Sequence, residues 1–249
     1  EVDEKTGVLK RDGVDSKMNP YDLYALETAL RIKEKKGGHI KVISMGPPQA
    51  KAVIKEAYSM GADEGTLVSD RKFAGADVLA TSYTLSQGVK KCGDFDIILC
   101  GKQTTDGDTA QVGPQIAEHL GIPQVSYVEK MDVEGEDTLV VQRQFEDRHQ
   151  IIEVKTPCLL TALAELADPR YMSVHGVFDA YREKEVKVWG LEDIKDTVNE
   201  GNIGLKGSPT RVKKSFTKQA KGAGTILNDL SDDEAVAAIV EKLQEKHII

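Results

Sequence analysis

The chain has 249 residues, 40% of them hydrophobic, which is enough to bury the core of one large domain. Its formal net charge of −8 argues against nucleic acid as the main partner, because neutralising phosphates requires a concentrated basic face. No apolar run is long enough to span a membrane, and the three cysteines are too scattered for a disulfide framework or a zinc site, so we expect a cytoplasmic protein without membrane insertion.

Strand and helix patterns alternate from residue 19 to residue 121. Asn19 and Pro20 predict the start of a helix that ends at Gly37. The next segments predict, in order, a strand at 39–46, a helix at 47–61, a strand at 65–70, a helix at 75–91, a strand at 95–101 and a helix ending at Gly121. The apolar run FDIILCG at 95–101 is typical of a strand buried on both faces. This order indicates an α/β fold with a mostly parallel, Rossmann-like sheet.

The pattern changes after residue 123. Apolar and polar residues alternate around a GED turn as far as TPCLLTAL, which predicts antiparallel strands appended to the sheet edge. From residue 168 onward, turn residues and weak periodicity indicate an extended arm, and SDDEAVAAIVEKLQEKHII predicts a last helix capped by Ser231. We therefore predict a nucleotide-binding domain at 1–185 and an arm with a C-terminal helix at 186–249. An isolated amphipathic helix needs a surface, which points to a partner chain or to its own domain.

The stretch GKQTTDGDTAQVGP leaves the strand at 95–101 and carries the chemistry of the sequence. In an open parallel sheet the ligand crevice lies at the carboxyl ends of the strands. Glycines, threonine hydroxyls and a helix that begins near Thr109 are the features that a phosphate site needs. The residues that we predict to bind a nucleotide here are Gly101, Gln103, Thr104, Asp106, Gly107, Asp108, Thr109, Ala110, Gln111, Val112, Gly113 and Pro114.

A simpler interpretation of this loop stays open from the residue types. Asp106 or Asp108 can cap the helix that follows, and Gly107 can satisfy a tight turn. If the loop binds a nucleotide, we expect the two acids to face ribose hydroxyls or backbone amides, because they would repel phosphates. The five histidines lack metal-ligand spacing and no nucleophile motif is present, so we predict neither a metal site nor catalytic residues. A nucleotide pocket without such groups indicates a cofactor carrier.

Several stretches together resemble the β subunit of electron-transfer flavoproteins. They are NPYDLYALETALRIKE, VISMGPPQA, AYSMGADEGTLVSDRKFAGADVLATSY, DIILCGKQTTDGDTAQVGPQIAEHLGIPQV and VKTPCLLTALAELADPRY. The resemblance implies a domain of the adenine-nucleotide α-hydrolase type and a heterodimer with an α subunit. The loop and KFAGAD are similar to the electron-bifurcating branch, in which FAD accepts a hydride from NADH and sends electrons to ferredoxin and, through the α-subunit FAD, to an acyl-CoA dehydrogenase-type flavoenzyme.

The resemblance also assigns residues outside the loop. Asn19 and Met45 stand where the family contacts the adenosine part of the nucleotide. The segment DRKFAGAD with Thr81 stands where bifurcating members hold the flavin part, with Phe73 and Gly75 against the ring or its ribityl chain; the residues concerned are Asp70, Phe73, Ala74, Gly75, Asp77 and Thr81. Without the resemblance, KFAGAD is better explained as a loop into a helix, with Phe73 as a plug in the core.

Partner contacts are implied on the segment 172–181, where the family docks on acyl-CoA dehydrogenases, with Tyr171, Val174 and Phe178 as contact residues. Respiratory members have lysines where this chain has Asp179, Arg182 and Glu183. Two alternatives stay open: a non-bifurcating β subunit that holds structural AMP, and a nucleotide-binding domain without a redox role. The family opens with a strand and a KQVPD-like loop that this sequence does not show, and we therefore expect its true beginning to be absent.

Overall fold

The computed structural model describes residues 16–105, 107–211, 213, 222–224 and 226–249. Its α-helices are α1 (Pro20–Lys36), α2 (Lys51–Met60), α3 (Val78–Cys92), α4 (Val112–Leu120), α5 (Val174–Arg182), α6 (Leu191–Ile194) and α7 (Asp232–Glu245). Its strands are β1 (Lys41–Met45), β2 (Glu64–Val68), β3 (Ile97–Gly101), β4 (Gln124–Glu134), β5 (Thr138–Gln144), β6 (His149–Lys155), β7 (Cys158–Ala162) and β8 (Lys187–Trp189). Short 3-10 turns precede α2 and lie at Arg71–Phe73, Ala164–Leu166 and Glu200–Asn202.

Helix α1 begins and ends where the sequence predicts. Asn19 has extended backbone angles and Pro20 occupies the first turn, where its missing N–H is not needed. Gly37 ends the helix at φ 80°, a conformation that favours glycine. Asp22 in the first turn and three lysines in the last turn complement the helix dipole.

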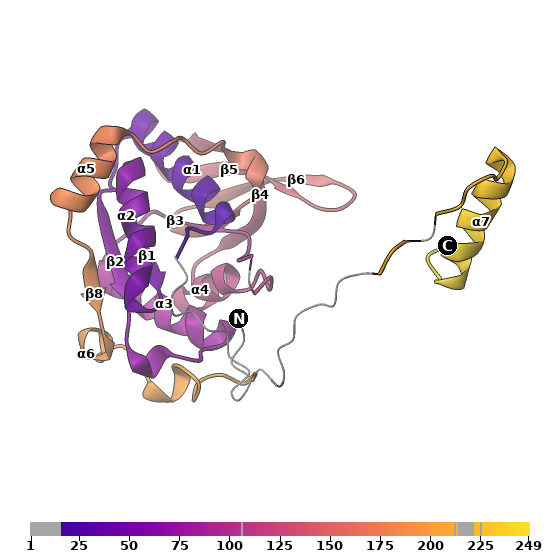
Figure 1. Ribbon diagram of the computed structural model, residues 1–249. Helices are drawn as coiled ribbons and strands as arrows, with labels where there is room; N and C mark the ends of the chain where they lie inside the picture. Colours follow the sequence, from indigo (N-terminus) through magenta and orange to yellow (C-terminus); the bar gives the residue numbers. More distant parts are fainter. Residues whose placement is uncertain (1–15, 106, 212, 214–221, 225) are drawn as a thin grey trace. The chain divides into compact units, whose positions relative to one another are not determined.

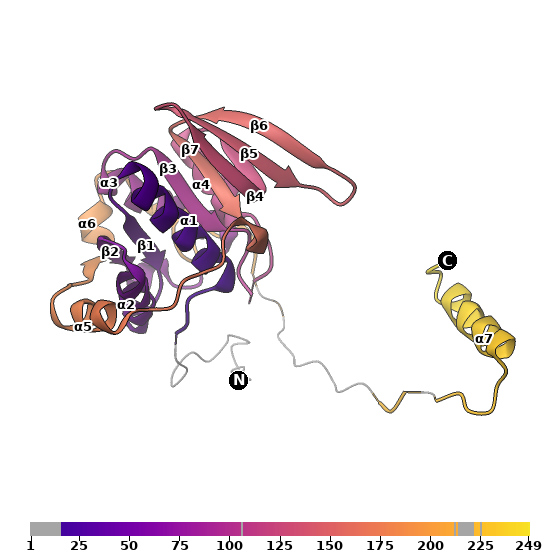
Figure 2. The same cartoon turned by 90° about the horizontal axis from the view of Figure 1, so that it is seen from above.

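The described strands form two sheets, a parallel one with order β1-β2-β8 and a mixed one with order β3-β7-β4-β5-β6 (Figures 1 and 2). The β3-β7-β4 part is parallel, and β4-β5-β6 is the antiparallel part. The predicted α/β class with a parallel sheet and antiparallel strands is confirmed. The sequence pattern predicts one parallel sheet for 39–46, 65–70 and 95–101. In the structure the first two of these strands lie in one sheet and the third lies in the other.

Two strand assignments need correction. Residues 158–162, which the sequence suggests as part of the antiparallel appendage, form β7 in the parallel part between β3 and β4. All its residues are buried, as expected of a central strand with helices on its faces. Strand β3, expected to be buried on both faces, is instead partly exposed at each residue, because in the described part of the chain it pairs only with β7.

Residues 168–211 are not the extended arm that the weak periodicity suggests. Helix α5 forms after Ser173, whose hydroxyl accepts a hydrogen bond of 2.9 Å from the amide of Gly176, and it packs beside α2 (Figures 1 and 2). Strand β8 adds to the first sheet next to β2. These elements are too short to give a clear periodic signal, and tertiary packing stabilises them. The compact unit extends to Arg211, beyond the expected boundary at residue 185.

The C-terminal helix α7 belongs to a second unit, separate from the one that ends at Arg211. Its predicted start is confirmed, since the carboxylate of Glu234 accepts hydrogen bonds from the amide and hydroxyl of Ser231 at 2.9 and 2.7 Å. Val236 and Ile239 on this helix are more than half exposed, so α7 presents apolar side chains to its surroundings. No helix among the described residues has the length and apolar character to cross a membrane.

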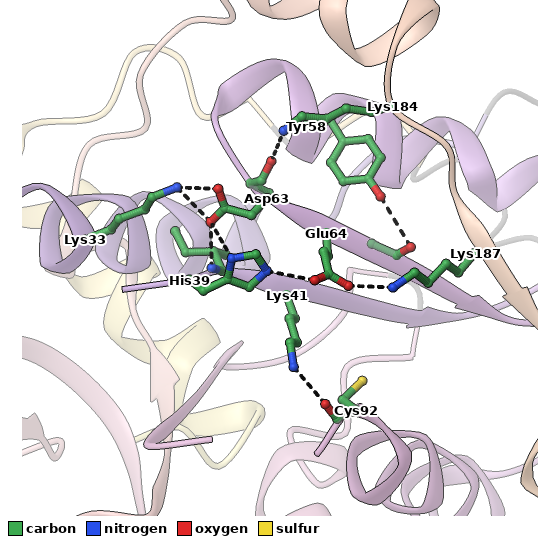
Figure 3. Close-up of polar contacts among 12 residues, drawn as sticks. Lys33, His39, Lys41, Tyr58, Asp63, Glu64, Cys92, Lys184 and Lys187 are labelled. Atoms are coloured by element: carbon green, nitrogen blue, oxygen red, sulfur yellow. Dashed lines mark hydrogen bonds and ion pairs between the residues drawn. The ribbon is translucent and has the colours of Figure 1, made fainter. Parts of the chain in front are cut away.

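A chain of charged side chains joins the amino ends of β1, β2 and β8 (Figure 3). The ammonium of Lys33 lies 2.6 and 2.7 Å from the two oxygens of Asp63, and Asp63 also accepts a 2.8 Å hydrogen bond from the amide of Ile40. Glu64 pairs with Lys187 at 2.6 Å and with His39 at 3.0 Å. This network closes the end of the sheet that is opposite the carboxyl ends of its strands.

Candidate functional site

The predicted phosphate loop leaves the carboxyl end of β3, and helix α1 holds its first residues. The carboxylate of Asp22 accepts a hydrogen bond of 2.6 Å from the amide of Gly101. The side-chain amide of Asn19 donates to the carbonyl of Gln103 at 2.8 Å and to Asp22 at 2.9 Å. Asn19, Gly101 and Gln103 therefore lie together, and Asn19 holds the loop backbone with its amide nitrogen.

The other end of the Asn19 side chain has an unused hydrogen-bond acceptor. Its Oδ1 atom is buried and has no hydrogen-bond partner among the described residues. A buried acceptor without a partner is costly, so a donor from a bound group would stabilise this arrangement. Gly101 itself is required by packing: a Cβ there would lie 2.6 Å from Cβ of Tyr21, so the glycine allows α1 to approach β3 closely.

The middle of the loop folds back on itself. The Thr104 hydroxyl accepts a 3.2 Å hydrogen bond from the amide of Gly107, and its carbonyl accepts one of 3.2 Å from the amide of Asp108. The carboxylate of Asp108 accepts from the side-chain amide of Gln103. Asp108 and Ala110 have φ values of 50° and 53°, a left-handed conformation that is strained for residues other than glycine. Asp106 lies outside the described residues.

Helix α4 begins at Val112, later than the start near Thr109 that the sequence suggests. Its N-cap residue is Gln111, and no side chain caps the helix. Asp108 does not cap this helix, because its carboxylate accepts a hydrogen bond from the side chain of Gln103 instead. Since the first amides of a helix have no partner within it, the amides of Val112 and Gly113 keep hydrogen-bonding capacity that the helix does not use.

Close packing fixes the start of α4 against the sheet. A Cβ on Gly113 would lie 2.7 Å from Sγ of Cys100 and 3.0 Å from Cγ2 of Thr161. Burial raises the pKa of the Cys100 thiol far above its ordinary value of 9.0, with a further rise from the nearby Asp22 carboxylate, so this thiol stays neutral. Its role is packing, which agrees with the default for a cysteine in an apolar strand.

The segment that the resemblance assigns to the flavin part makes internal contacts. Phe73 is 3% exposed and packs with Val68, Leu191, Ile194 and Ile203. Met45 is partly buried against the same cluster. The ring of Phe73 therefore contributes to the core, as the interpretation without the resemblance predicts, and it does not offer a face to a flavin in this structure.

Both carboxylates of this segment accept hydrogen bonds from the chain itself. Asp70 accepts from the amides of Lys72 and Leu191, at 2.9 and 3.0 Å. Asp77 caps α3 through the amides of Leu79 and Ala80, at 3.0 and 3.1 Å. The pKa of Asp70 is lowered by its backbone hydrogen bonds; for Asp77, burial raises the pKa but the hydrogen bonds outweigh it and the net direction is downward.

The remaining predicted residues, Ala74, Gly75 and Thr81, have structural roles that involve their backbone groups. Gly75 has φ 73°, which favours glycine, and the carbonyl of Ala74 accepts a 3.1 Å hydrogen bond from the amide of Leu205. Thr81 donates its amide to the carbonyl of Asp77 at 2.9 Å, inside α3. Helix α3 is joined to α4 because the Ser82 hydroxyl donates to the side chain of Gln115 at 2.9 Å. The two predicted groups of residues are thus carried on neighbouring helices.

The predicted partner-binding residues form an exposed apolar surface, which we call the α5 face. Tyr171 is 98% exposed, Val174 75% and Phe178 49%. Met172, Val177 and Tyr181 extend the same surface. Large exposed apolar patches of this kind mark interaction sites.

An ion-pair cluster anchors the start of the α5 face to α1. The guanidinium of Arg170 donates to Glu27 at 2.8 and 3.1 Å and to Glu34 at 2.5 Å. Glu27 is buried, so burial raises its pKa, but hydrogen bonds from Arg170 and Arg31 outweigh this and the net pKa lies below 4.5. The sequence patterns do not single out Asp22 or Glu27, although both lie in the stretch NPYDLYALETALRIKE. Asp22 contacts the start of the 101–114 loop, and Glu27 contacts Arg170.

The fold is α/β, with the 101–114 loop leaving the carboxyl end of β3, which pairs in parallel with β7. In the described residues, no group of three or more His, Cys, Asp or Glu side chains is placed to hold a metal ion. A family model described as the electron transfer flavoprotein domain matches residues 6–194. The chain belongs to the electron transfer flavoprotein family.

Known proteins align over nearly the whole chain. An electron transfer flavoprotein subunit beta of Clostridium acetobutylicum is 56% identical over 100% of this chain and 93% of that protein. The caffeyl-CoA reductase-Etf complex subunit CarD of Acetobacterium woodii is 49% identical over 100% of this chain and 94% of that protein. The acryloyl-CoA reductase electron transfer subunit gamma of Anaerotignum propionicum is 44% identical over 98% and 92%. These names support the β-subunit resemblance.

Proposed function

We propose that this chain is the β subunit of an NADH-dependent, electron-bifurcating flavoprotein and binds FAD at the 101–114 loop. The observation that carries the proposal is the uncapped start of α4, which lies at the end of a loop fixed to α1 by Asp22 and Asn19. Free helix-start amides at the carboxyl edge of a parallel sheet form a site for phosphates. The buried, unpartnered Oδ1 of Asn19 is an acceptor for a donor on the same ligand.

The residues divide into three roles in this proposal. The amides of Gln111, Val112 and Gly113 and the hydroxyls of Thr104, Thr105 and Thr109 bind the phosphates. Asp108 exchanges its hydrogen bond with Gln103 for one with a ribose hydroxyl, since a carboxylate and a phosphate repel each other. The backbone at Ala74 and Gly75, and not the buried ring of Phe73, borders the flavin part. FAD bound there would supply acceptance of a hydride from NADH and delivery of single electrons.

The relatives support the partners in this proposal. Two of them are named as subunits of a caffeyl-CoA reductase-Etf complex and of an acryloyl-CoA reductase. By similarity, this chain pairs with an α subunit and passes electrons through the α-subunit FAD to an acyl-CoA dehydrogenase-type flavoenzyme docked on the α5 face, with ferredoxin as the second acceptor. We propose that the complex works in the cytoplasm.

One observation favours a second candidate function, a β subunit that holds AMP as a structural ligand. Phe73, the aromatic residue that the resemblance places against the flavin ring, is buried in the core. AMP needs only the 101–114 loop and the Asn19 region, and it makes no use of the segment 70–77. The two candidates therefore share the phosphate site and differ in the ligand that extends from it.

Nucleotide extraction from the purified heterodimer separates the two candidates. Two FAD molecules per heterodimer support the bifurcating function, whereas one FAD and one AMP contradict it. AMP or ATP without any flavin favours a nucleotide-binding protein with no redox role. A second assay follows ferredoxin reduction by NADH with and without an acyl-CoA acceptor and its dehydrogenase. Reduction that requires the acceptor is the expected result, and reduction that ignores it contradicts coupling of the two electron routes.

A further inference from the structure

Residues 199–210 lie along the segment 70–77 and are bonded to it at several points. The Ser208 hydroxyl accepts a 2.8 Å hydrogen bond from the amide of Asp77 and donates one of 2.7 Å to the carbonyl of Gly204. The second oxygen of Asp77 accepts from the amide and the hydroxyl of Thr210, at 3.0 and 2.8 Å. We call this set of contacts the 77–210 latch.

The latch requires close approach of two backbones. A Cβ on Gly204 would lie 2.1 Å from the carbonyl oxygen of Lys72, and Gly204 has φ 54°. Both features require glycine at this position. The amide of Leu205 bonds the carbonyl of Ala74, and the side chain of Leu205 would contact a Cβ added to Gly75 at 3.4 Å. The two segments thus fit together through glycines as well as through hydrogen bonds.

Asp77 is the centre of the latch because it serves both sides. One carboxylate oxygen binds the first amides of α3, and the other binds Thr210. Hydrogen bonds to a charged acceptor are stronger than those between neutral groups. Asp77 therefore fixes the 70–77 segment between α3 and the end of the compact unit, which extends to Arg211.

We propose that the 77–210 latch positions the 70–77 segment for the flavin part of the cofactor. FAD retention then depends on Ser208 and Thr210, at the end of the compact unit. Ser208, Thr210 and Asp77 act as positioning residues. The apparent affinity of a ligand that binds the latched segment is proportional to the fraction of molecules in which the latch is closed. AMP does not reach this segment, so its affinity is independent of the latch. The inference rests on the proposed FAD function.

The test compares FAD and AMP affinities of the full chain in complex with an α subunit, after removal of bound nucleotide. Thr210→Val removes the hydroxyl that donates to Asp77 while keeping the shape of the side chain, and Ser208→Ala removes the acceptor for the Asp77 amide. We expect each variant to bind FAD about tenfold more weakly and AMP within about twofold of the parent, because each loses a hydrogen bond of the latch and only FAD extends to the segment that the latch holds. Thr210→Ser, which keeps the hydroxyl, restores FAD affinity.

The matched control is Thr197→Val, since the Thr197 hydroxyl donates only to the carbonyl of Ile194 one turn away and outside the latch. Its FAD and AMP affinities stay at the parent values. An equal loss of both ligands in Thr210→Val and Ser208→Ala, or no loss of either, overturns the latch as a positioning device. If the parent complex binds AMP and no FAD at this chain, the proposed function fails, and that result is distinct because it does not require the variants.

Discussion

Asp22 and Gly101 are separated by 79 positions in the sequence, yet the carboxylate of Asp22 accepts the amide hydrogen of Gly101 at 2.6 Å. Asp22 belongs to the first turn of α1, and Gly101 is the last residue of β3. This hydrogen bond sets the direction in which the 101–114 loop leaves the sheet. The loop therefore depends on a helix that precedes it by several elements.

Asp22→Ala tests that dependence. The substitution leaves the partly buried amide of Gly101 without its acceptor, which costs about 1–3 kcal/mol. We expect AMP and FAD to bind about tenfold more weakly, measured by titration calorimetry on nucleotide-free protein. Asp94→Ala, at an exposed carboxylate outside the site, is the control and keeps the parent affinity. Unchanged affinity in Asp22→Ala would show that α1 does not set the loop.

Gly113→Ala places a methyl group 2.7 Å from the sulfur of Cys100. Alanine favours helices by about 1 kcal/mol over glycine, so helix propensity alone predicts stabilisation. We expect the opposite sign, a loss of about 1–3 kcal/mol with weaker nucleotide binding, because overpacking moves the start of α4 off the sheet. Chemical denaturation measures the free energy of unfolding. Gly222→Ala is the control, because a Cβ there meets no atom within 4 Å.

Arg170→Ala leaves the buried carboxylate of Glu27 with Arg31 and the backbone amide of residue 170 as its remaining partners. We expect a loss of about 2 kcal/mol, less than for a fully buried pair because Arg170 is one-third exposed. The pKa of Glu27 lies below 4.5 in the folded protein, so its contribution is complete above that pH and is lost as the pH falls through the folded value. The difference between parent and variant is therefore constant at neutral pH and shrinks in acid.

Urea denaturation of both proteins at several pH values measures that difference. Arg148→Ala, at an exposed arginine, is expected to change the free energy of unfolding by less than about 0.5 kcal/mol. A gap between parent and Arg170→Ala that widens as the solution is acidified would contradict the assignment of Glu27 as the titrating partner.

Asp63→Asn affects stability without affecting the site, because Asp63 lies at the amino end of the first sheet (Figure 3). Burial raises the pKa of Asp63, but hydrogen bonds from the Ile40 amide and Lys33 outweigh it and the net pKa falls below 3.8. Its contribution is present above that pH and lost as the pH falls, so the variant is less stable at pH 7 by about 1 kcal/mol. Nucleotide affinity stays within about twofold; a larger change would place the ligand at the wrong end of the sheet.

Val174→Asp and Phe178→Asp put charge on the α5 face. Since both side chains are exposed, we expect little change in thermal stability but at least a tenfold lower rate of electron transfer to the dehydrogenase partner. Stopped-flow measurement of partner reduction provides the rate. Ile151→Asp, at an exposed apolar residue of β6, is the matched control and leaves the rate unchanged. Equal rates in all three variants would remove the α5 face as the docking surface.

The sequence predicts those elements well in which local signals and tertiary structure agree. Helix α1 has a proline start, charges suited to the dipole and a glycine end, and α7 has its Ser231–Glu234 cap. The helix–strand order from 19 to 121 follows from periodicity in the same way. Periodicity does not reveal which strands pair with each other. It cannot place β7 between β3 and β4, because strand pairing depends on segments that are distant in the sequence.

The site shows the same limit. Residue types single out the 101–114 loop as a candidate, because glycines, hydroxyls and a strand end are local features, but they place the start of the following helix near Thr109 and not at Val112. They do not identify Asp22, whose role depends on a partner 79 positions away, or Thr210, whose partner is Asp77. For Phe73 the local signal is misleading. An aromatic residue close to a glycine suggests a ligand contact, but the ring is buried against Leu191 and Ile203 and belongs to the core.

Helix α1 connects the start of the 101–114 loop to the start of the α5 face. Asp22 contacts the loop and Glu27 contacts Arg170, the residue before Tyr171. The five residue steps from Asp22 to Glu27 correspond to about 7.5 Å along the helix axis. The Asp22–Gly101 hydrogen bond and the Glu27–Arg170 pair therefore hold the start of the 101–114 loop and the start of the α5 face on the same helix, at a separation along its axis that helix geometry fixes.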